Sequence, residues 1–246
     1  MKTAHYLLII FFYFSPANAI VNVEDKISTT QQQGIVGNVS LSGNGSIGNS
    51  ETSKIAFKNQ TSYLHGNHSE TLFLNATYGE SRGIKNKDFR EIHLRHSSKF
   101  KDTLAWEVFS QWSANPFIRL NNRGLVGGGL RWDFSNKTNK NILGTGLFYE
   151  YEEINNGGEF NLIRGNLYLS YKSPSKHNLS IKSTTYLQPN LTKLNDFRVL
   201  ESAKLLFALN KKVSLQFTLE ITFDNEPPVS VEKHDINYST GIKYVF

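Results

Sequence analysis

The sequence of 246 residues contains no cysteine. This absence excludes a disulfide scaffold, a cysteine-based zinc site, an iron–sulfur cluster and a thiol nucleophile. Long apolar runs are also missing and the mean hydropathy is −0.39, which excludes a helical membrane protein built on runs of about 18 apolar residues. Aromatic residues make up 13% of the chain, and this share argues against disorder. By these values alone the chain resembles an ordinary soluble protein.

The N-terminal segment has the pattern of an export signal. Lys2 supplies a basic start, Tyr6–Phe14 is apolar, and Pro16 ends the apolar run. Ala17 and Ala19 place small residues at the two positions that a signal peptidase requires. An apolar run this short cannot cross roughly 30 Å of hydrocarbon at 1.5 Å per residue. We therefore expect residues 1–19 to be a signal peptide that directs export.

Period-two alternation of apolar and polar residues dominates the rest of the chain. After a polar lead-in over 20–33, it is clearest in Val213–Phe223, where every second residue is apolar. A helix would distribute these apolar residues around its axis, so the pattern predicts strands. Twelve strands are expected, at 34–43, 52–64, 70–81, 89–98, 103–113, 124–134, 142–152, 161–172, 178–188, 197–209, 213–223 and 233–246.

Proline positions and link lengths add detail to this assignment. All six prolines fall outside the expected strands, as they should because proline lacks a ladder donor. The links after even-numbered strands are short, and those after odd-numbered strands tend to be longer. This alternation is typical of an outer-membrane barrel. The rival architecture is a secreted soluble β-sandwich or lipocalin-like barrel.

Ionisable residues lie opposite the apolar face on nearly every strand. Twelve strands form a cylinder too wide for a small dry core, so this face is predicted to line a polar lumen, with the apolar face towards lipid. The candidate lumen charges are Lys54, Lys58, Glu91, Arg95, Glu107, Arg131, Asp133, Glu150, Arg164, Lys182, Glu220, Asp235 and Lys243.

The last strand carries a second indication of an outer-membrane barrel. Phe246, Tyr244 and Ile242 alternate with polar residues after Gly241, and this pattern resembles the signal by which the barrel-assembly machinery recognises its clients. We therefore expect that machinery and outer-membrane lipid as partners, and no nucleic acid. The end of the barrel that holds Phe246 is expected in the periplasm, where basic turns would face anionic headgroups.

Several glycine-rich segments carry a family resemblance. They are the stretch 34–50, with Gly43, Gly45 and the turn at 48–50, the strand 124–134, and Gly241–Phe246. In these segments the chain is similar to the YdiY-like family, described as salt-induced outer-membrane proteins and defined mainly as a domain of unknown function. The similarity covers most of residues 34–246. It implies a barrel of poorly defined activity and supplies no catalytic residues.

Direct inspection gives no enzyme signature. The nearest match to an outer-membrane phospholipase motif is His96-Ser97-Ser98, which lacks the required spacing and the Asn-Gly. A protease would need a histidine near Glu152 and Glu153, and none is placed there.

Metal and cofactor sites are likewise not expected. His65 and His68 suggest a metal pair, but only Glu70 is near them in sequence. The glycines at 127–129 are not followed by a helix, so they do not form a phosphate loop. We expect no catalytic, metal or cofactor residues.

The sequence therefore predicts an all-β, transmembrane antiparallel barrel of about twelve strands at 34–246. Its function is expected to be a small-solute pore or a structural barrel of the envelope salt response. An outer-membrane hydrolase of lipase or protease type is the alternative, and a soluble binding barrel is a further one.

Overall fold

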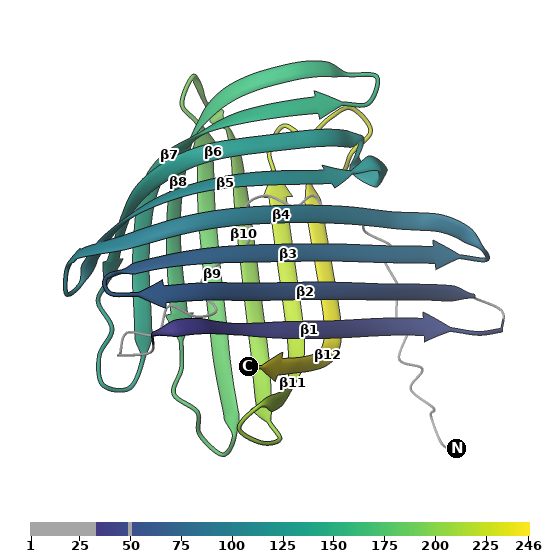
Figure 1. Ribbon diagram of the computed structural model, residues 1–246. Helices are drawn as coiled ribbons and strands as arrows, with labels where there is room; N and C mark the ends of the chain where they lie inside the picture. Colours follow the sequence, from purple (N-terminus) through teal and green to yellow (C-terminus); the bar gives the residue numbers. More distant parts are fainter. Residues whose placement is uncertain (1–32, 49–50) are drawn as a thin grey trace, which may run out of the picture.

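The protein forms an all-β closed barrel (Figure 1). The structure is a computed structural model, and it describes residues 33–48 and 51–246. A single 3-10 turn, η1 (Pro116–Ile118), interrupts the strands of this described part. The strands are β1 (Gly34–Ser46), β2 (Thr52–His65), β3 (His68–Ser81), β4 (Ile84–Lys101), β5 (Leu104–Asn115), β6 (Leu120–Asp133), β7 (Lys140–Ile154), β8 (Gly158–Lys172), β9 (Leu179–Asn190), β10 (Lys193–Ala208), β11 (Val213–Asp224) and β12 (His234–Val245).

Every strand pairs antiparallel with its neighbours in sequence, and β1 closes the barrel against β12. This order confirms the predicted antiparallel barrel of twelve strands. No helix in the described ranges is long and apolar enough to cross a membrane. The two ends of the barrel are named here by their turns. The β1–β2 rim carries the connections that follow odd-numbered strands, and the β2–β3 rim carries those that follow even-numbered strands.

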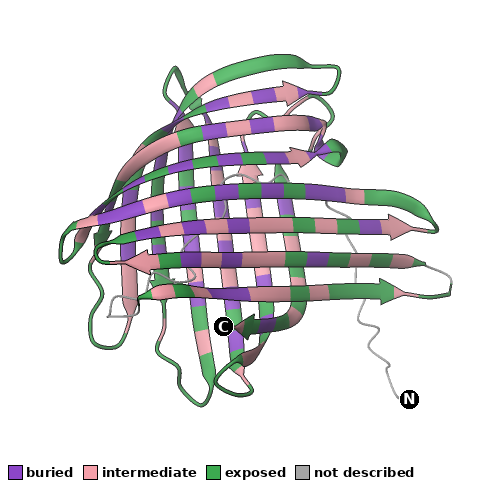
Figure 2. Cartoon of the chain, viewed as in Figure 1, coloured by how far each residue is buried: buried purple, intermediate pink, exposed green. Residues whose placement is uncertain are grey.

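The two faces of the barrel wall differ in polarity. Buried and exposed residues alternate along the strands (Figure 2), because successive side chains of a strand point to opposite faces. The outward face carries exposed apolar side chains such as Leu169, Leu205 and Phe217. The buried inward face is rich in charged and amide side chains. A polar interior with an apolar exterior is the inverse of a soluble barrel and is the pattern of a transmembrane one.

Two glycines allow close contacts at the seam between β1 and β12. The backbone of Phe246 exchanges two hydrogen bonds with Gly37, both of 3.1 Å. A Cβ on Gly37 would lie 2.5 Å from the Phe246 ring, and one on Gly241 would lie 2.5 Å from the Leu41 carbonyl oxygen. Larger residues at either position would therefore push the closing strands apart.

The expected alternation of link lengths is wrong. Strands continue through several segments predicted as long links, so β3 and β4 are joined by Arg82 and Gly83 alone. Both residues have positive φ, of 50° and 72°, as a tight two-residue hairpin turn requires. The strands continue where polar residues accumulate, because polar residues at a rim extend a strand without facing lipid.

The expectation that every proline lies outside a strand is also wrong. Pro189 belongs to β9, opposite Phe197 of β10. The β9–β10 ladder shifts register between Lys193 and Phe197, and the β8–β9 ladder has no pairs between those of Arg164 and Leu167. Proline is tolerated in a strand at such an irregularity, because no regular ladder bond needs its missing N–H.

The predicted signal peptide and its cleavage residues Ala17 and Ala19 lie outside the described residues, as does the lead-in up to residue 32.

Candidate functional site: the barrel lumen

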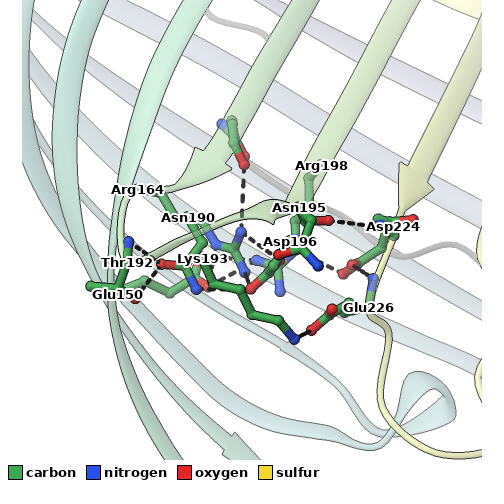
Figure 3. A network of polar contacts seen from close by, with 12 residues as sticks. Glu150, Arg164, Asn190, Thr192, Lys193, Asn195, Asp196, Arg198, Asp224 and Glu226 are labelled. Carbon is green, nitrogen blue, oxygen red and sulfur yellow. Dashed lines mark hydrogen bonds and ion pairs between the residues drawn. The ribbon is translucent and has the colours of Figure 1, made fainter.

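A buried network of ion pairs fills part of the lumen near the β1–β2 rim (Figure 3). Arg198 of β10 is at its centre. Its guanidinium donates to Glu150 at 2.9 and 3.0 Å, to Glu152 at 3.0 Å and to Asp224 at 2.8 Å. These four side chains are between 2% and 7% exposed. Such shielding makes each contact stronger than a surface pair.

Two further arginines extend this rim network. Arg164 of β8 donates to Glu150 at 3.2 Å and to Asp196 at 2.9 Å. Arg123 of β6 donates to Glu152 at 2.6 Å. The network therefore ties together β6, β7, β8, β10 and β11 across the lumen.

A second buried cluster lies closer to the β2–β3 rim. Glu107 of β5 accepts from Arg95 at 3.1 Å, from Arg131 at 3.3 Å and from the Tyr168 hydroxyl at 3.0 Å. The Tyr168 ring reaches this position because it lies over Gly144, where a Cβ would be 2.0 Å from the ring. A glycine in the wall thus makes room for an aromatic side chain in the lumen.

Apolar side chains fill the space beside these two clusters. They form one buried group of Phe109, Leu125, Ile142, Phe148, Tyr168, Tyr186 and Leu200. Phe109 and Phe148 crowd Gly127, where a Cβ would lie 2.7 and 2.5 Å from them. Gly127 thus leaves room for both aromatic rings in the lumen. The part of the lumen that holds this apolar group and the two ion-pair clusters is packed with side chains, and it is called the filled side.

The opposite part of the lumen holds a cavity of about 130 Å³. Its walls come from β1–β4 and β9–β12, and this region is called the cavity side. Lys54, Lys58, Lys87 and Lys204 line the cavity, together with the acids Glu91 and Glu220. Glu201 also borders it, but its carboxylate is turned outwards to Ser183 and Thr185. Amide, hydroxyl and aromatic side chains make up most of the remaining lining.

The charges of the cavity side are arranged differently from those of the filled side. Lys58 forms an ion pair with Glu220. Glu91 accepts from Asn75 and, at 3.1 Å, from Gln111. Lys87 donates to Asn237 at 3.1 Å. Positive side chains therefore outnumber the acids around the cavity, whereas acids outnumber arginines in the rim network.

The structure places the thirteen predicted lumen charges as follows. Glu107, Arg131, Arg95, Glu150 and Arg164 join the two buried clusters, and Lys54, Lys58, Glu91 and Glu220 line the cavity. Lys182, Asp235 and Lys243 are buried elsewhere on the inner face, and Asp133 is half-buried at the β2–β3 rim, where it accepts from the Ser135 N–H.

Sequence reasoning missed several residues of these sites. Arg123, Asp196 and Asp224 were assigned to links, as was Lys87. Each lies in register with the buried positions of its own strand, as Asp196 does with Arg198 and Leu200. Arg198 and Lys204 lie within an expected strand but were also not among the predicted lumen charges. Following the period-two pattern into the polar segments would have found the four link residues, and applying it along 197–209 would have found Arg198 and Lys204.

The histidines near the β2–β3 rim face outwards and form a cluster that sequence spacing did not show. Glu70 accepts from His65 and from His96, both at 2.8 Å. His68 stacks on both rings, with centroid separations of 5.4 and 5.7 Å. Nevertheless, over residues 33–48 and 51–246 no group of three or more His, Asp or Glu has the geometry of a metal site.

The candidate hydrolase residues do not converge. His96 packs against the outward Trp106, with ring centroids 4.9 Å apart, while Ser97 is buried on the inner face. Glu152 is part of the rim network and Glu153 bonds instead to Asn121 and Asn122. No nucleophile, base and acid are therefore aligned in these segments.

Comparison with family models gives one match, over residues 39–246, to the family described as "Protein of unknown function, DUF481". The chain belongs to the DUF481 family. This membership confirms the resemblance to YdiY-like proteins. No curated protein matches the DUF481 chain.

Solved structures share the fold of this DUF481 barrel at low sequence identity. The NanC porin is 10% identical, with a TM-score of 0.53 over 85% of this chain and 98% of that chain. The translocator domain of autotransporter NalP from Neisseria meningitidis is 9% identical, with a TM-score of 0.50 over 85% of this chain and 87% of that chain. The fold is therefore that of transmembrane outer-membrane barrels.

Proposed function

We propose that this DUF481 protein is an outer-membrane barrel that conducts small solutes along the cavity side of its lumen. The observation that carries the proposal is the division of the lumen. The filled side is closed by buried ion pairs and aromatic rings, while the cavity side keeps a polar space lined by charged groups. A charged, hydrated lining is what a pore for polar solutes needs.

The outward face supports the membrane location. Trp106, Trp112 and Trp132 are 39%, 39% and 48% exposed, as expected for aromatic girdles at a membrane interface. Export by the N-terminal signal and folding by the barrel-assembly machinery complete this proposal.

A closed structural barrel in the envelope salt response is the second candidate. The specific observation in its favour is the rim network, which ties five strands together with side chains of low exposure. Such a network stiffens a barrel whether or not solute passes beside it. An enzymatic role has no comparable support, because the candidate hydrolase residues point to different faces.

Conductance of the purified protein in planar bilayers separates the two candidates. Tyr186 lines the cavity and packs on Tyr168 at a centroid distance of 5.3 Å, so its ring divides the cavity from the filled side. A pore predicts small conductance steps that grow in Tyr186→Ala. The outward Tyr171 provides the matched control, because Tyr171→Ala leaves the lumen unchanged. If neither the wild type nor Tyr186→Ala shows conductance, the pore is contradicted and the closed structural barrel is the remaining candidate.

A further inference from the structure

The lysines of the cavity come from opposite walls of the lumen. Lys54 and Lys58 lie on β2 and Lys87 on β4, while Lys204 lies on β10. All four ammonium-bearing side chains line the same space. Glu91 and Glu220 are the acids of the lining that face the lumen, since the Glu201 carboxylate is turned outwards to Ser183 and Thr185. The excess of positive charge in the lumen-facing lining is therefore 4 − 2 = 2.

Two of these lysines are neighbours. Lys54 of β2 and Lys87 of β4 both pair with Gly79 of β3, and they line the cavity on either side of it. Gly79 places no side chain between the two lysines. Like charges held together in a partly desolvated space repel one another. A bound anion between two ammonium groups removes that repulsion and gains charge-assisted hydrogen bonds from both.

The groups that face this lysine pair are two acids and one amide. Glu220 and Asp235 are the acids close enough to act on Lys87. Glu220 is shared, because it pairs with Lys58 and also lies near Lys204. Asn237 contributes an amide oxygen to Lys87. The acids therefore neutralise part of the local charge and leave room for an external anion.

Resting on the proposed pore, we propose that the cavity is a binding site for a small solute with two or more anionic oxygens, held by Lys54 and Lys87 and attracted by Lys58 and Lys204. Phosphate and carboxylate groups share this chemistry. Lysine is suited to it, because its ammonium is a compact charge with three donors. A cavity of about 130 Å³ limits the solute to a small molecule.

Binding of pyrophosphate to the detergent-solubilised barrel tests the site without requiring conductance. Isothermal titration calorimetry is expected to show binding that is at least tenfold weaker in the Lys54→Gln/Lys87→Gln double variant. Lys243→Gln is the matched control, because Lys243 is a buried lumen lysine that does not line the cavity. Heat-dependent gel migration of each variant establishes that the barrel has folded. Equal affinity of the wild type and the folded double variant, or no binding to either, overturns the anion site.

Reversal potentials in a salt gradient separate this inference from the pore itself. An anion-preferring wild type that loses its preference in the double variant supports both. A barrel that conducts without anion preference and does not bind pyrophosphate overturns the anion site and keeps the pore. A barrel that does not conduct but binds pyrophosphate through Lys54 and Lys87 supports the anion site and overturns the pore.

Discussion

Replacing Arg198 by methionine tests whether the rim network is a dry, cooperative element of the barrel. The network contains three arginines and four carboxylates, a net charge of 3 − 4 = −1. Methionine keeps much of the side-chain volume but removes contacts to Glu150, Glu152 and Asp224. The remaining charge becomes 2 − 4 = −2, concentrated on side chains that water reaches poorly.

Removing one partner of a buried ion pair costs about 3–5 kcal/mol, because the other charge stays buried without compensation. We expect Arg198→Met to lower the free energy of unfolding by this amount. The Arg198→Met/Glu152→Gln double variant returns the network to 2 − 3 = −1, and should recover part of the loss.

Unfolding in urea of protein folded into lipid vesicles, followed by fluorescence of the outward tryptophans, measures these changes. Lys193→Met is the control at the same rim, since Lys193 and Glu226 form an ion pair with side chains 51% and 38% exposed (Figure 3). Exposed pairs contribute about 0–1 kcal/mol. A loss for Arg198→Met as small as that of Lys193→Met would refute the argument and show that water replaces the arginine.

Three further changes test other parts of the barrel. The outward Glu201 accepts from Ser183 at 2.8 Å and from Thr185. We expect Ser183→Ala/Thr185→Val to lower the free energy of unfolding in urea by about 1–3 kcal/mol, since the carboxylate loses its donors. Glu201→Gln should change that free energy little. Equal stability of the first variant and the wild type would contradict this role. Gly144→Val should lower the free energy of unfolding by about 1–3 kcal/mol, because the new side chain displaces the Tyr168 ring. Gly124→Ala should leave it unchanged, since no atom lies within 4 Å of the new Cβ. The same unfolding assay measures both variants, and similar losses of stability would exclude the proposed packing. Phe246→Ala should reduce the fraction of heat-modifiable, folded barrel on gels more than Tyr238→Ala, because the Phe246 ring packs over Gly37 at the seam; equal yields would show that the ring is dispensable for closure.

Much of the barrel follows from local sequence pattern. Alternation such as that of Val213–Phe223 depends only on the direction of successive side chains. The number of strands, the antiparallel barrel and its polar inner face could therefore be predicted from the chain alone. The rims were predicted less well, because polar residues such as Lys87 and Asp196 occur equally in turns and at the ends of long strands.

Only the tertiary structure decided which inward charges meet. Arg198 and Glu150 are 48 residues apart, and Tyr168 and Glu107 are 61 apart; their contacts depend on strand register, tilt and the glycines that admit aromatic rings into the lumen. The sequence by itself determined a lumen rich in charge. Its division into a filled side and a lysine-lined cavity side required the closed barrel, because side chains from distant strands share one interior only after β1 meets β12.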